Sequence, residues 1–513
     1  MITRGAKALA GIAAATVALG VARLLAAFLG PTADAHAAVG AAVIDRTPAP
    51  VREWAIQTFG TADKLVLSVL VVAVVVVIAA ATAGWETRRF PIGSTAIAGG
   101  AVIGCAAVLS RTGATAADVV PTVVGAGCGI AVLRLLVSGR VVDAPAARDD
   151  GPDRGRRLSL VTLGFLGAGA LSGALGTVIA RRRASVAGER AAVALPPVDV
   201  AAPPVPPEVQ PKGVALPSFI TGNGEFYRID TALAVPQLSR DDWRLRIHGL
   251  VDREITYRFD DLDAFTTVEK VITLTCVSNP VGGDLIGTAT WLGYRVRDLL
   301  APCGVRPEAD MVLSTSVDGF TVGTPLEALV DDRDALLAVG MNGQPLPTEH
   351  GYPARLVVPG LYGYVSATKW VVDLEVTRFD RARAFWTRHG WSERGPIKTQ
   401  SRIDVPRDGQ QVERGPVVLG GVAWAQPRGV REAQVRITGP DGQPGEWLPA
   451  ALGASYSGDT WRLWSLRWQA TRPGRHTVTV RAVDNDGVVQ TEAQAGPVPD
   501  GATGWHSVAF TVR

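Results

Sequence analysis

The stretch Val271-Ile-Thr-Leu-Thr-Cys276-Val-Ser-Asn-Pro280 decides how the middle of this chain folds. Apolar and β-branched residues lead into Cys276 and a Ser-Asn-Pro turn follows at once, which predicts a buried strand that delivers the cysteine to the mouth of a loop. A thiol held there can be a nucleophile, half of a disulfide with Cys303, a metal ligand or inert core. On spacing alone, inert core is the favoured interpretation.

Length, charge and cysteine usage narrow the class of protein. The chain has 513 residues, too many for one hydrophobic core, so we expect two to four domains. Its formal net charge of +3 gives no indication of a protein that binds nucleic acid. The cysteines are Cys105, Cys128, Cys276 and Cys303, without a Cys-x-x-Cys pair or a Cys/His cluster. Zinc and iron–sulfur sites are therefore not expected.

Residues 1–183 are rich in Ala, Val, Gly and Leu and predict a transmembrane region of about five helices, since a span needs about 20 residues. The expected spans are 8–30, 65–84, 92–109, 117–137 and 158–179. Basic residues favour the cytoplasmic side, which places the chain after Ile179 on the extracytoplasmic side. If every segment spans, the basic residues on the cytoplasmic side are Arg4, Lys7, Arg88, Arg89, Arg140, Arg148, Arg154, Arg156 and Arg157.

The fifth span has unusual flanks. The cluster Arg181-Arg-Arg183 would lie on the outer side, against the usual charge rule. The run Arg156-Arg157-Leu158-Ser159-Leu160 resembles a twin-arginine export signal, with Ser159 where a bulky apolar residue is more usual. An ordinary last span with a basic flank is the alternative, and we favour the twin-arginine interpretation because it explains both features.

The predicted spans contain no histidine and no acidic residue deep inside them. A bis-His haem within the membrane region is therefore excluded, and an ion relay of the usual kind is not expected. The spans are best interpreted as a passive anchor or a docking surface for a partner. The following segment, 184–215, is rich in Pro-Pro pairs, which predicts a stiff polyproline II spacer that holds a folded domain off the membrane surface.

Residues 216–397 mix strand and helix patterns, which predicts an α+β domain. Strands are expected at 243–249, 271–276, 311–317, 335–341 and 367–376, a short helix at 259–265, and a turn into a helix at 291–300. A turn at Asn342-Gly343 and a turn followed by a strand over 350–359 complete the pattern.

Five motifs occur in order within this region. They are Thr273-Leu-Thr-Cys276-x-x-Asn279, Trp291-x-Gly-x-x-x-Arg-Asp-Leu-Leu300, Met341-Asn-Gly-x-Pro-Leu, His350-Gly-Tyr-Pro-x-Arg355-Leu-Val-Val-Pro-Gly360 and Lys369-Trp370. No single motif is specific, but the ordered set resembles the molybdopterin domain of the sulfite oxidase family. The opening stretch, 219–228, also resembles the start of this domain in bacterial exported members.

The resemblance implies a mononuclear molybdenum centre, held by the dithiolene of one molybdopterin and by the thiolate of Cys276. Soft sulfur suits such a metal, and Cys276 would be its catalytic ligand rather than a nucleophile. The pterin phosphate needs cations and backbone N–H groups around it. Without the family pattern, Arg355 or Lys369 alone would be assigned as a surface cation and His350 as a turn residue. By family position, the cofactor would be lined by Asn223, Phe226, Tyr227, Arg228, Cys276, Ser316, His350, Arg355, Ser366, Thr368 and Lys369.

The chain departs from the family pattern at positions that bear on the substrate. Sulfite oxidases carry a basic pair directly after the Cys-x-x-Asn motif, and this chain has Pro280 and Val281 there. The departure favours a substrate less anionic than sulfite. Arg394, Lys398 and Arg402 are other cations that could supply charge, although the sequence does not place them in the pocket.

Residues 398–513 contain short alternating segments separated by Gly- and Pro-bearing turns, typical of an immunoglobulin-like β-sandwich. The segments are 416–424, 430–438, 461–469, 474–482 and 506–512. Trp424, Trp464 and Arg481-Ala-x-Asp484 resemble the dimerisation domain of sulfite oxidases, which implies a homodimer. A Tyr is usual in the family where this chain has Val422, a second sign of a different substrate pocket.

The sequence therefore predicts a membrane-anchored molybdenum oxidoreductase with its catalytic domain outside the cytoplasm. It would transfer an oxygen atom between water and a small substrate such as sulfite, a sulfoxide or an N-oxide. No cytochrome-b5-like haem domain precedes the motifs, so electrons would pass to or from a separate cytochrome or quinone-linked partner. The alternative is a non-enzymatic, membrane-tethered binding protein in which Cys276 is structural. A transporter is disfavoured because the spans lack deep charged residues.

Overall fold

The computed structural model describes residues 3–48, 51, 54–55, 58–59, 62–87, 89–111, 114–138, 154–232 and 234–513. The chain divides into two compact units, which are described separately. Unit 1 comprises Met1–Ser185 and Asp230–Gln237, and unit 2 comprises Val186–Ile229 and Leu238–Arg513.

Unit 1 is helical, and five of its helices are long and apolar enough to cross a membrane. The five predicted spans coincide with these helices. A further helix, α2, was not predicted, and it begins after Asp34, whose carboxylate accepts hydrogen bonds from the backbone of its first turn. The helices are α1 (Arg4–Leu29), α2 (Ala35–Arg46), α4 (Asp63–Ala83), α5 (Ile92–Leu109), α6 (Val120–Val137) and α7 (Arg154–Ala184).

Part of the charge pattern used to orient the spans cannot be compared with the structure. Arg88, Arg140 and Arg148 lie outside the described residues. The twin-arginine pair, Arg156 and Arg157, falls within α7, but only the backbone of these two residues is described. Helix α7 is continuous through the basic cluster that follows the fifth span. The orientation and the export signal therefore stay predictions.

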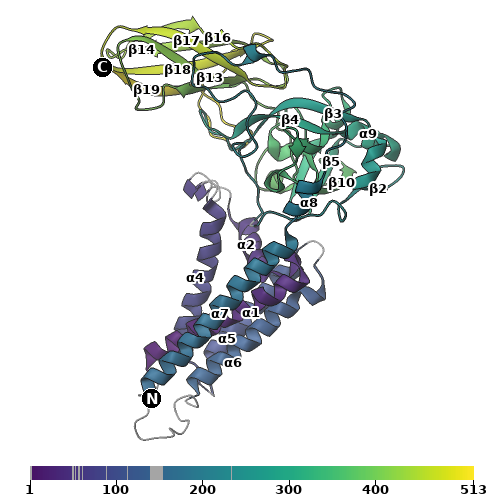
Figure 1. Cartoon of the computed structure of the whole chain (residues 1–513), viewed down its shortest axis with the longest axis vertical. Helices are drawn as coiled ribbons and strands as arrows, with labels where there is room; N and C mark the ends of the chain where they lie inside the picture. The colour runs from purple at the N-terminus through teal and green to yellow at the C-terminus, as the bar shows by residue number, and fades with distance from the viewer. Residues whose placement is uncertain are drawn as a thin grey trace. The chain divides into compact units, whose positions relative to one another are not determined.

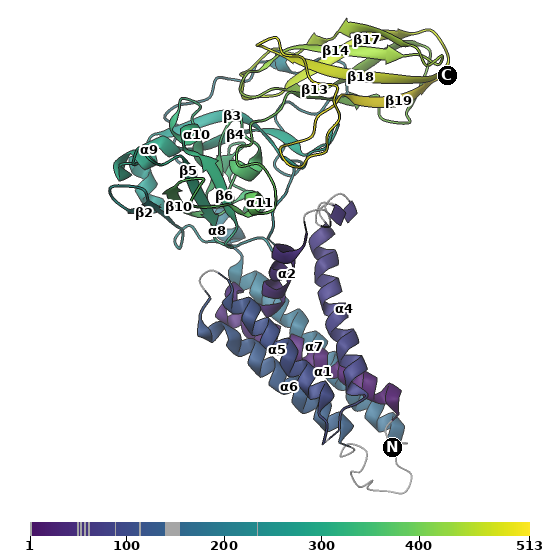
Figure 2. The same ribbon diagram turned by 180° about the vertical axis from the view of Figure 1, so that it is seen from behind.

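Small residues allow α1 to approach its neighbours closely. A Cβ added at Gly20 of α1 would collide with the backbone of Gly169 in α7, and one at Gly125 of α6 would collide with the backbone of Ala18 in α1. Figures 1 and 2 both show α1, α6 and α7 running side by side. In lipid, such close contact supplies the van der Waals packing that holds helices together.

The first part of unit 2 contains two mixed or antiparallel sheets and short helices. The two sheets have the strand orders β2-β1-β10-β5-β6 and β3-β4-β7-β8, with β9 also paired to β7. The strands and helices are β1 (Arg244–Gly249), β2 (Ile255–Arg258), β3 (Thr267–Thr275), β4 (Ile286–Arg295), α9 (Val296–Leu300), β5 (Met311–Ser316), β6 (Thr321–Pro325), α10 (Leu326–Val330), β7 (Leu336–Met341), β8 (Gln344–Pro345), β9 (Arg355–Val357), β10 (Val371–Thr377) and α11 (Phe385–Arg388).

The predicted strands of this region are confirmed, and one prediction is wrong. The run from Trp291 was expected to turn directly into a helix, whereas its first half continues β4 and only Val296–Leu300 is helical. The reason is tertiary, because β4 pairs with both β3 and β7 along this stretch. Neither Cys276 nor Cys303 forms a disulfide, so the disulfide alternative is also wrong.

The Pro-rich segment 184–215 is not a free spacer, contrary to the prediction. Within unit 2, a short helix, α8 (Ala187–Ala192), is held by Glu189, whose carboxylate accepts a 2.7 Å hydrogen bond from the Tyr352 hydroxyl. Val200 forms a parallel bridge with β3. The prediction failed because extended polyproline-like chain has no internal hydrogen bonds, and its backbone groups bond here to a neighbouring strand.

The C-terminal part of unit 2 consists of two stacked sheets, visible in Figure 1 as overlapping layers of strands. Their strand orders are β11-β13-β17-β16 and β12-β19-β18-β14-β15, and the core between them contains Leu419, Trp464, Val480 and Phe510. The strands are β11 (Gln400–Val405), β12 (Gln411–Val412), β13 (Gly415–Trp424), β14 (Val430–Thr438), β15 (Pro444–Pro449), β16 (Ala451–Leu452), β17 (Arg462–Ala470), β18 (Gly474–Asp484) and β19 (His506–Val512).

Strand β3 joins the two parts of unit 2. Near its C-terminal end, the buried Thr273 donates its backbone N–H to the carbonyl of Asp459, and its hydroxyl accepts a 2.9 Å hydrogen bond from the backbone N–H of Trp461. The Trp461 indole donates to the carbonyl of Phe219 at 3.0 Å, and its ring is 2% exposed in a hydrophobic cluster that both parts share. The strand that ends at Cys276 is therefore packed from both sides.

Replacing Trp461 by Ala should lower the free energy of unfolding of unit 2 by about 3–5 kcal/mol, the usual cost of removing a buried Trp side chain. Chemical denaturation of the detergent-purified protein, followed by tryptophan fluorescence, measures the change. Val488→Ala is the matched control, since Val488 is 60% exposed and its loss should cost at most about 0.5 kcal/mol. Equal effects of the two substitutions would contradict the proposed packing of β3.

Candidate cofactor site

Cys276 directly follows β3, at the start of a compact loop. Every residue of β3 from Val271 to Thr275 is buried, and Cys276 itself is 9% exposed. Its backbone N–H donates to the carbonyl of Leu285 at 2.9 Å, and its own carbonyl accepts from Asn279 N–H at 3.1 Å. The structure thus confirms a buried strand that delivers the thiol to the mouth of a loop.

Arg355 is a buried cation at the start of β9. It is 5% exposed, and its guanidinium donates to the backbone carbonyls of Leu356, His350 and Ala367 at 3.3, 3.1 and 3.4 Å. No carboxylate lies within ion-pair distance of it among the described residues. Burial lowers the pKa of Arg355 to about 10. Such a charge is costly to bury alone, so the site is suited to an anion.

His350 lies beside this cation and is kept neutral. It is 3% exposed, and burial, reinforced by the charge of Arg355, lowers its pKa to about 4. Its Nε2 is 3.1 Å from the carbonyl oxygen of Asn223, which can only accept, so Nε2 carries the proton. The unprotonated Nδ1 is therefore the ring nitrogen that can accept a hydrogen bond.

Aromatic rings form one wall of the site. Phe226 stacks on Tyr227 with centroids 5.2 Å apart and meets Trp291 and His350 edge-on at 5.8 and 5.6 Å. The Arg355 guanidinium lies over the Trp291 ring at 5.1 Å. Burial and the nearby Cys276 raise the pKa of Tyr227, so its hydroxyl stays protonated and can donate.

The segment around Asn223 is fixed by a second asparagine. The Nδ2 of Asn342 donates to the Oδ1 of Asn223 at 2.8 Å and to the carbonyl of Thr221 at 2.9 Å. Asn342 has a positive φ of 51°, as expected in the Asn-Gly turn identified from the sequence. These bonds hold the 219–228 segment against the end of β7.

Three of the remaining predicted residues, Ser366, Thr368 and Lys369, already form hydrogen bonds within the protein. The Ser366 hydroxyl lies 2.9 Å from the Tyr362 carbonyl, and the Thr368 hydroxyl is 2.7 Å from Ser314, so both hydroxyls have protein partners. The Lys369 ammonium donates to the Glu349 carbonyl at 3.1 Å, next to His350. Arg228 is half-buried and follows Tyr227 in the chain.

Three buried polar atoms around Cys276 and β5 have no hydrogen-bond partner within the part of the chain that the structure describes. They are the hydroxyls of Thr275 and Ser316 and the amide nitrogen of Asn279. No cluster of three or more His, Cys, Asp or Glu side chains that could hold a metal occurs among the described residues. A metal at Cys276 would need ligands from a bound organic group. The residues present therefore fit an anionic cofactor that brings its own metal ligands.

Other groups near Cys276 were not predicted from the sequence. Tyr362 is 2% exposed, and burial raises its pKa to about 12, with a contribution from Cys276. Its hydroxyl accepts from the backbone N–H of Lys398, whose ammonium binds Asp500 at 2.8 Å. No sequence motif marked Tyr362, because its place depends on a loop of the C-terminal sheets.

Besides Lys398, the two other cations considered as replacements for the basic pair are Arg394 and Arg402, and they have different positions. Arg394 forms a 2.5 Å ion pair with Glu327 on the surface, where both side chains are more than half exposed. Arg402 is 8% exposed and donates to the carbonyl of Gly283 at 3.0 Å, within the loop after Cys276. Arg402 therefore lies beside that loop, whereas Arg394 does not.

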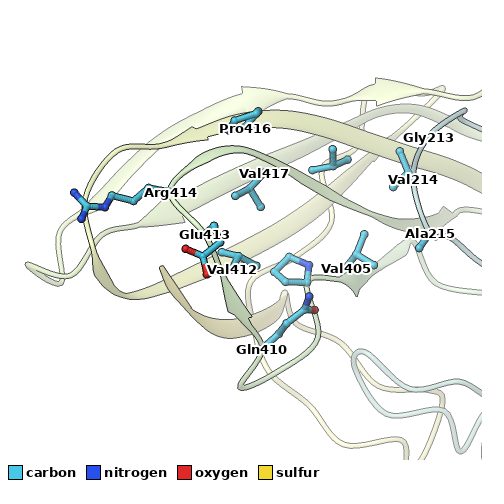
Figure 3. Close-up of a pocket in the computed structure, with 12 residues that line it drawn as sticks. Gly213, Val214, Ala215, Val405, Gln410, Val412, Glu413, Arg414, Pro416 and Val417 are labelled. Atoms are coloured by element: carbon cyan, nitrogen blue, oxygen red, sulfur yellow. The ribbon is translucent and has the colours of Figure 1, made fainter. Parts of the chain in front are cut away.

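A separate pocket of about 360 Å³ lies in the C-terminal part of unit 2 (Figure 3). Val405, Val412 and Val417 line it, and the charged end of Arg414 points away from it. None of the residues predicted to bind the cofactor contributes to it, so it is distinct from the Cys276 site. Its lining is Gly213, Val214, Ala215, Val405, Pro406, Gln410, Val412, Glu413, Arg414, Pro416, Val417 and Val418.

Comparison with known proteins assigns the region around Cys276 to a protein family. Residues 232–386 match the model of the oxidoreductase molybdopterin binding domain. Mitochondrial sulfite oxidase of Rattus norvegicus is 30% identical over 324 residues, which cover 54% of this chain and 58% of that protein. The human enzyme is also 30% identical and is covered to 58%. The chain thus spans little more than half the length of these curated relatives.

Two further proteins are similar. The uncharacterized oxidoreductase YuiH of Bacillus subtilis is 35% identical over 153 residues, covering 30% of this chain and 74% of that protein. The crystal structure of the sulfane dehydrogenase SoxCD from Paracoccus pantotrophus has 26% identity and a TM-score of 0.47, covering 54% of this chain and 75% of that one. Together with the family match, the relatives show that the chain belongs to the sulfite oxidase family of molybdopterin-dependent oxidoreductases.

Proposed function

We propose that this protein is a molybdenum-cofactor enzyme that transfers an oxygen atom between water and a small substrate. The observation that carries the proposal is the buried Arg355 cation, which has no carboxylate partner among the described residues. It lies near His350 and Tyr227, and Tyr227 in turn lies near the Cys276 thiol. When bound, the cofactor would supply two-electron redox chemistry, with the substrate oxidised or reduced by two electrons and two protons exchanged with water.

The chain's own residues would bind and orient that cofactor. Arg355 and Lys369 are the cations that would face its phosphate. Protonated Tyr227 and the unpartnered hydroxyl of Ser316 would donate hydrogen bonds. Cys276 would be the protein's sulfur ligand to the metal. Asn223, Phe226, Arg228, His350, Ser366 and Thr368 would shape the pocket, with Ser366 and Thr368 acting through the backbone and Ser314.

The charges beside the loop after Cys276 support a substrate less anionic than sulfite. Pro280 and Val281 replace the family's basic pair. The two nearest cations are each neutralised, Arg402 by Asp404 at 2.9 Å and Lys398 by Asp500 at 2.8 Å. A neutral sulfoxide or N-oxide suits such a site better than a dianion, because neither of these two cations has an unpaired positive charge to offer the substrate.

The location and partners belong to the same proposal. Five helices could anchor the protein in a membrane, and the charge pattern of the sequence supports an extracytoplasmic catalytic part, exported through a twin-arginine signal. Electrons would be exchanged with a separate cytochrome or quinone-linked carrier. The two C-terminal sheets, interpreted as an immunoglobulin-like sandwich, would support a homodimer.

The alternative is a membrane-tethered binding protein that keeps this fold without the cofactor. It is less well supported, because it leaves the Arg355 charge and the unpartnered Thr275 and Ser316 hydroxyls without a function. Molybdenum analysis separates the two proposals, since the binding protein would contain none when made in a host that synthesises the cofactor.

Purified parent protein should contain about one molybdenum per chain, and Cys276→Ser should lose at least about 100-fold in activity, since it removes a ligand that tunes the metal. Elemental analysis and turnover of sulfite, sulfoxides and N-oxides with artificial electron carriers measure both effects. Cys303→Ser is the matched control, because Cys303 is fully buried away from the site and bonded to the Leu299 carbonyl. Unchanged activity in Cys276→Ser would refute the assigned ligand.

Arg355→Met should weaken pterin retention by roughly 30-fold or more, the effect expected when one partner of a buried charge pair is removed. Fluorescence of the oxidised pterin, released from protein after dialysis, measures the bound fraction. Arg394→Met removes an equally charged but exposed residue and should retain the pterin. A pterin content in Arg355→Met equal to that of the control would show that this cation does not bind the cofactor.

His350 should make the protein sensitive to acid. Its pKa is lowered from 6.5 to about 4, so below the ordinary value the unfolded chain binds a proton that the native state does not. Stability should fall by up to about 3 kcal/mol as pH decreases from about 6.5 to about 4. In His350→Gln, the urea midpoint should depend less steeply on pH over this window. An unchanged slope would contradict the neutral, buried His350.

A further inference from the structure

The loop that follows the cysteine, residues 277–285, is closed by hydrogen bonds onto the backbone of Cys276. We call it the post-cysteine loop. Both backbone groups of Leu285 form hydrogen bonds that close the loop. Its carbonyl accepts from the Cys276 N–H at 2.9 Å, and its N–H donates to the Oδ1 of Asn279 at 3.0 Å. The Asn279 N–H returns to the Cys276 carbonyl at 3.1 Å. Any displacement of this loop therefore reaches the cysteine directly.

Two side chains from the C-terminal sheets lie on the post-cysteine loop. The imidazole of His506 packs against Gly282, so closely that a Cβ at Gly282 would collide with the ring. One nitrogen of the Arg402 guanidinium donates to the carbonyl of Gly283 at 3.0 Å. Gly283 is itself packed against the Oδ1 of Asn279, where a Cβ would also collide. The contacts thus run without a break from the sheets to Cys276.

Both side chains are held in place by their own surroundings. Arg402 is 8% exposed, and its Nε donates to Asp404 at 2.9 Å, while the Trp464 indole fixes its carbonyl at 3.2 Å. The Nδ1 of His506 accepts from the backbone N–H of Ile403 at 3.0 Å. The loop is therefore met by a pre-ordered surface rather than by mobile surface side chains.

We propose that Arg402, Asp404 and His506 form a clamp that positions the post-cysteine loop, and through it Cys276. The C-terminal sheets would then be a working part of the cofactor site and not only a surface for dimerisation. Because Asp404 neutralises Arg402, the clamp acts by holding the loop and not by adding charge to the substrate pocket. The importance of this positioning for catalysis rests on the proposed function, whereas the positioning itself does not.

Accessibility of the Cys276 thiol tests the clamp without relying on activity. Two sets of variants loosen it: Gly282→Ala forces the His506 ring away, and Arg402→Met combined with Asp404→Asn removes the tether without leaving a buried charge unpaired. Alkylation of Cys276 by iodoacetamide, followed by peptide mass spectrometry on full-length protein from a host that lacks the cofactor, should become about 10-fold faster in both. Cys303, which is fully buried, is the internal control for global unfolding.

Matched variants exclude a general effect of the substitutions. Gly409→Ala places a Cβ at a similar positive φ of 72° where nothing lies within 4 Å, and Arg472→Met with Asp441→Asn removes an exposed ion pair of the same sheets. Both should alkylate Cys276 at the parent rate. His506→Ala should expose Cys276, and adding Gly282→Ala to it should cause no further increase, because the two act through one contact.

Molybdenum retention in the same variants, made in a host that synthesises the cofactor, separates the two proposals. Faster Cys276 alkylation with slow Cys303 alkylation supports the clamp, even if the parent contains no molybdenum and the proposed function fails. Cys276 alkylation at the parent rate in every clamp variant would overturn the clamp, whatever the metal content. If Cys303 becomes reactive in one variant, that variant is unfolding, and the clamp is then tested by comparing His506→Ala with the double variant His506→Ala, Gly282→Ala. Equal Cys276 alkylation in these two supports the clamp, and faster alkylation in the double variant contradicts it.

Discussion

The burial of a positive charge is the constraint on which the site depends. Arg355 is 5% exposed and satisfies its N–H groups with backbone carbonyls, which solvate a guanidinium without neutralising it. Burying such a cation costs free energy unless an anion lies beside it. Its surroundings are therefore suited to an anionic ligand and do not serve stability alone. The neutral state of His350 and the protonated state of Tyr227 follow from the same burial.

Strand β3 connects this site to the rest of unit 2. Thr273, near the end of β3, accepts a hydrogen bond from the backbone of Trp461, which directly precedes β17, and Cys276 directly follows Thr275, the last residue of β3. One strand therefore contacts the C-terminal part and also positions the proposed metal ligand. The post-cysteine loop repeats the arrangement, with Arg402 and His506 reaching it from the same sheets. The sheets of unit 2 thus fall into two parts, but residues from both parts position Cys276.

Local patterns predicted much of this structure, and long-range contacts account for the rest. The apolar run into Cys276, the length and composition of the five spans, and the alternation of the segments after residue 398 specify their elements directly. Docking of α8 depends on Glu189 meeting Tyr352, far away in sequence, and no local pattern reports it. Likewise, the hydrogen bond from the Ser366 hydroxyl to the Tyr362 carbonyl could not be predicted from the sequence. The contact of His506 with Gly282 could be found only from the folded chain.

The most direct test of the central claim is molybdenum X-ray absorption spectroscopy, which counts the sulfur atoms bound to the metal. If one pterin dithiolene and Cys276 hold the molybdenum, the parent should show three sulfur neighbours and the Cys276→Ser variant two. An equal sulfur count in the two proteins would show that Cys276 is not a ligand. A parent without molybdenum, from a host that makes the cofactor, would contradict the assignment of the site as a molybdenum centre.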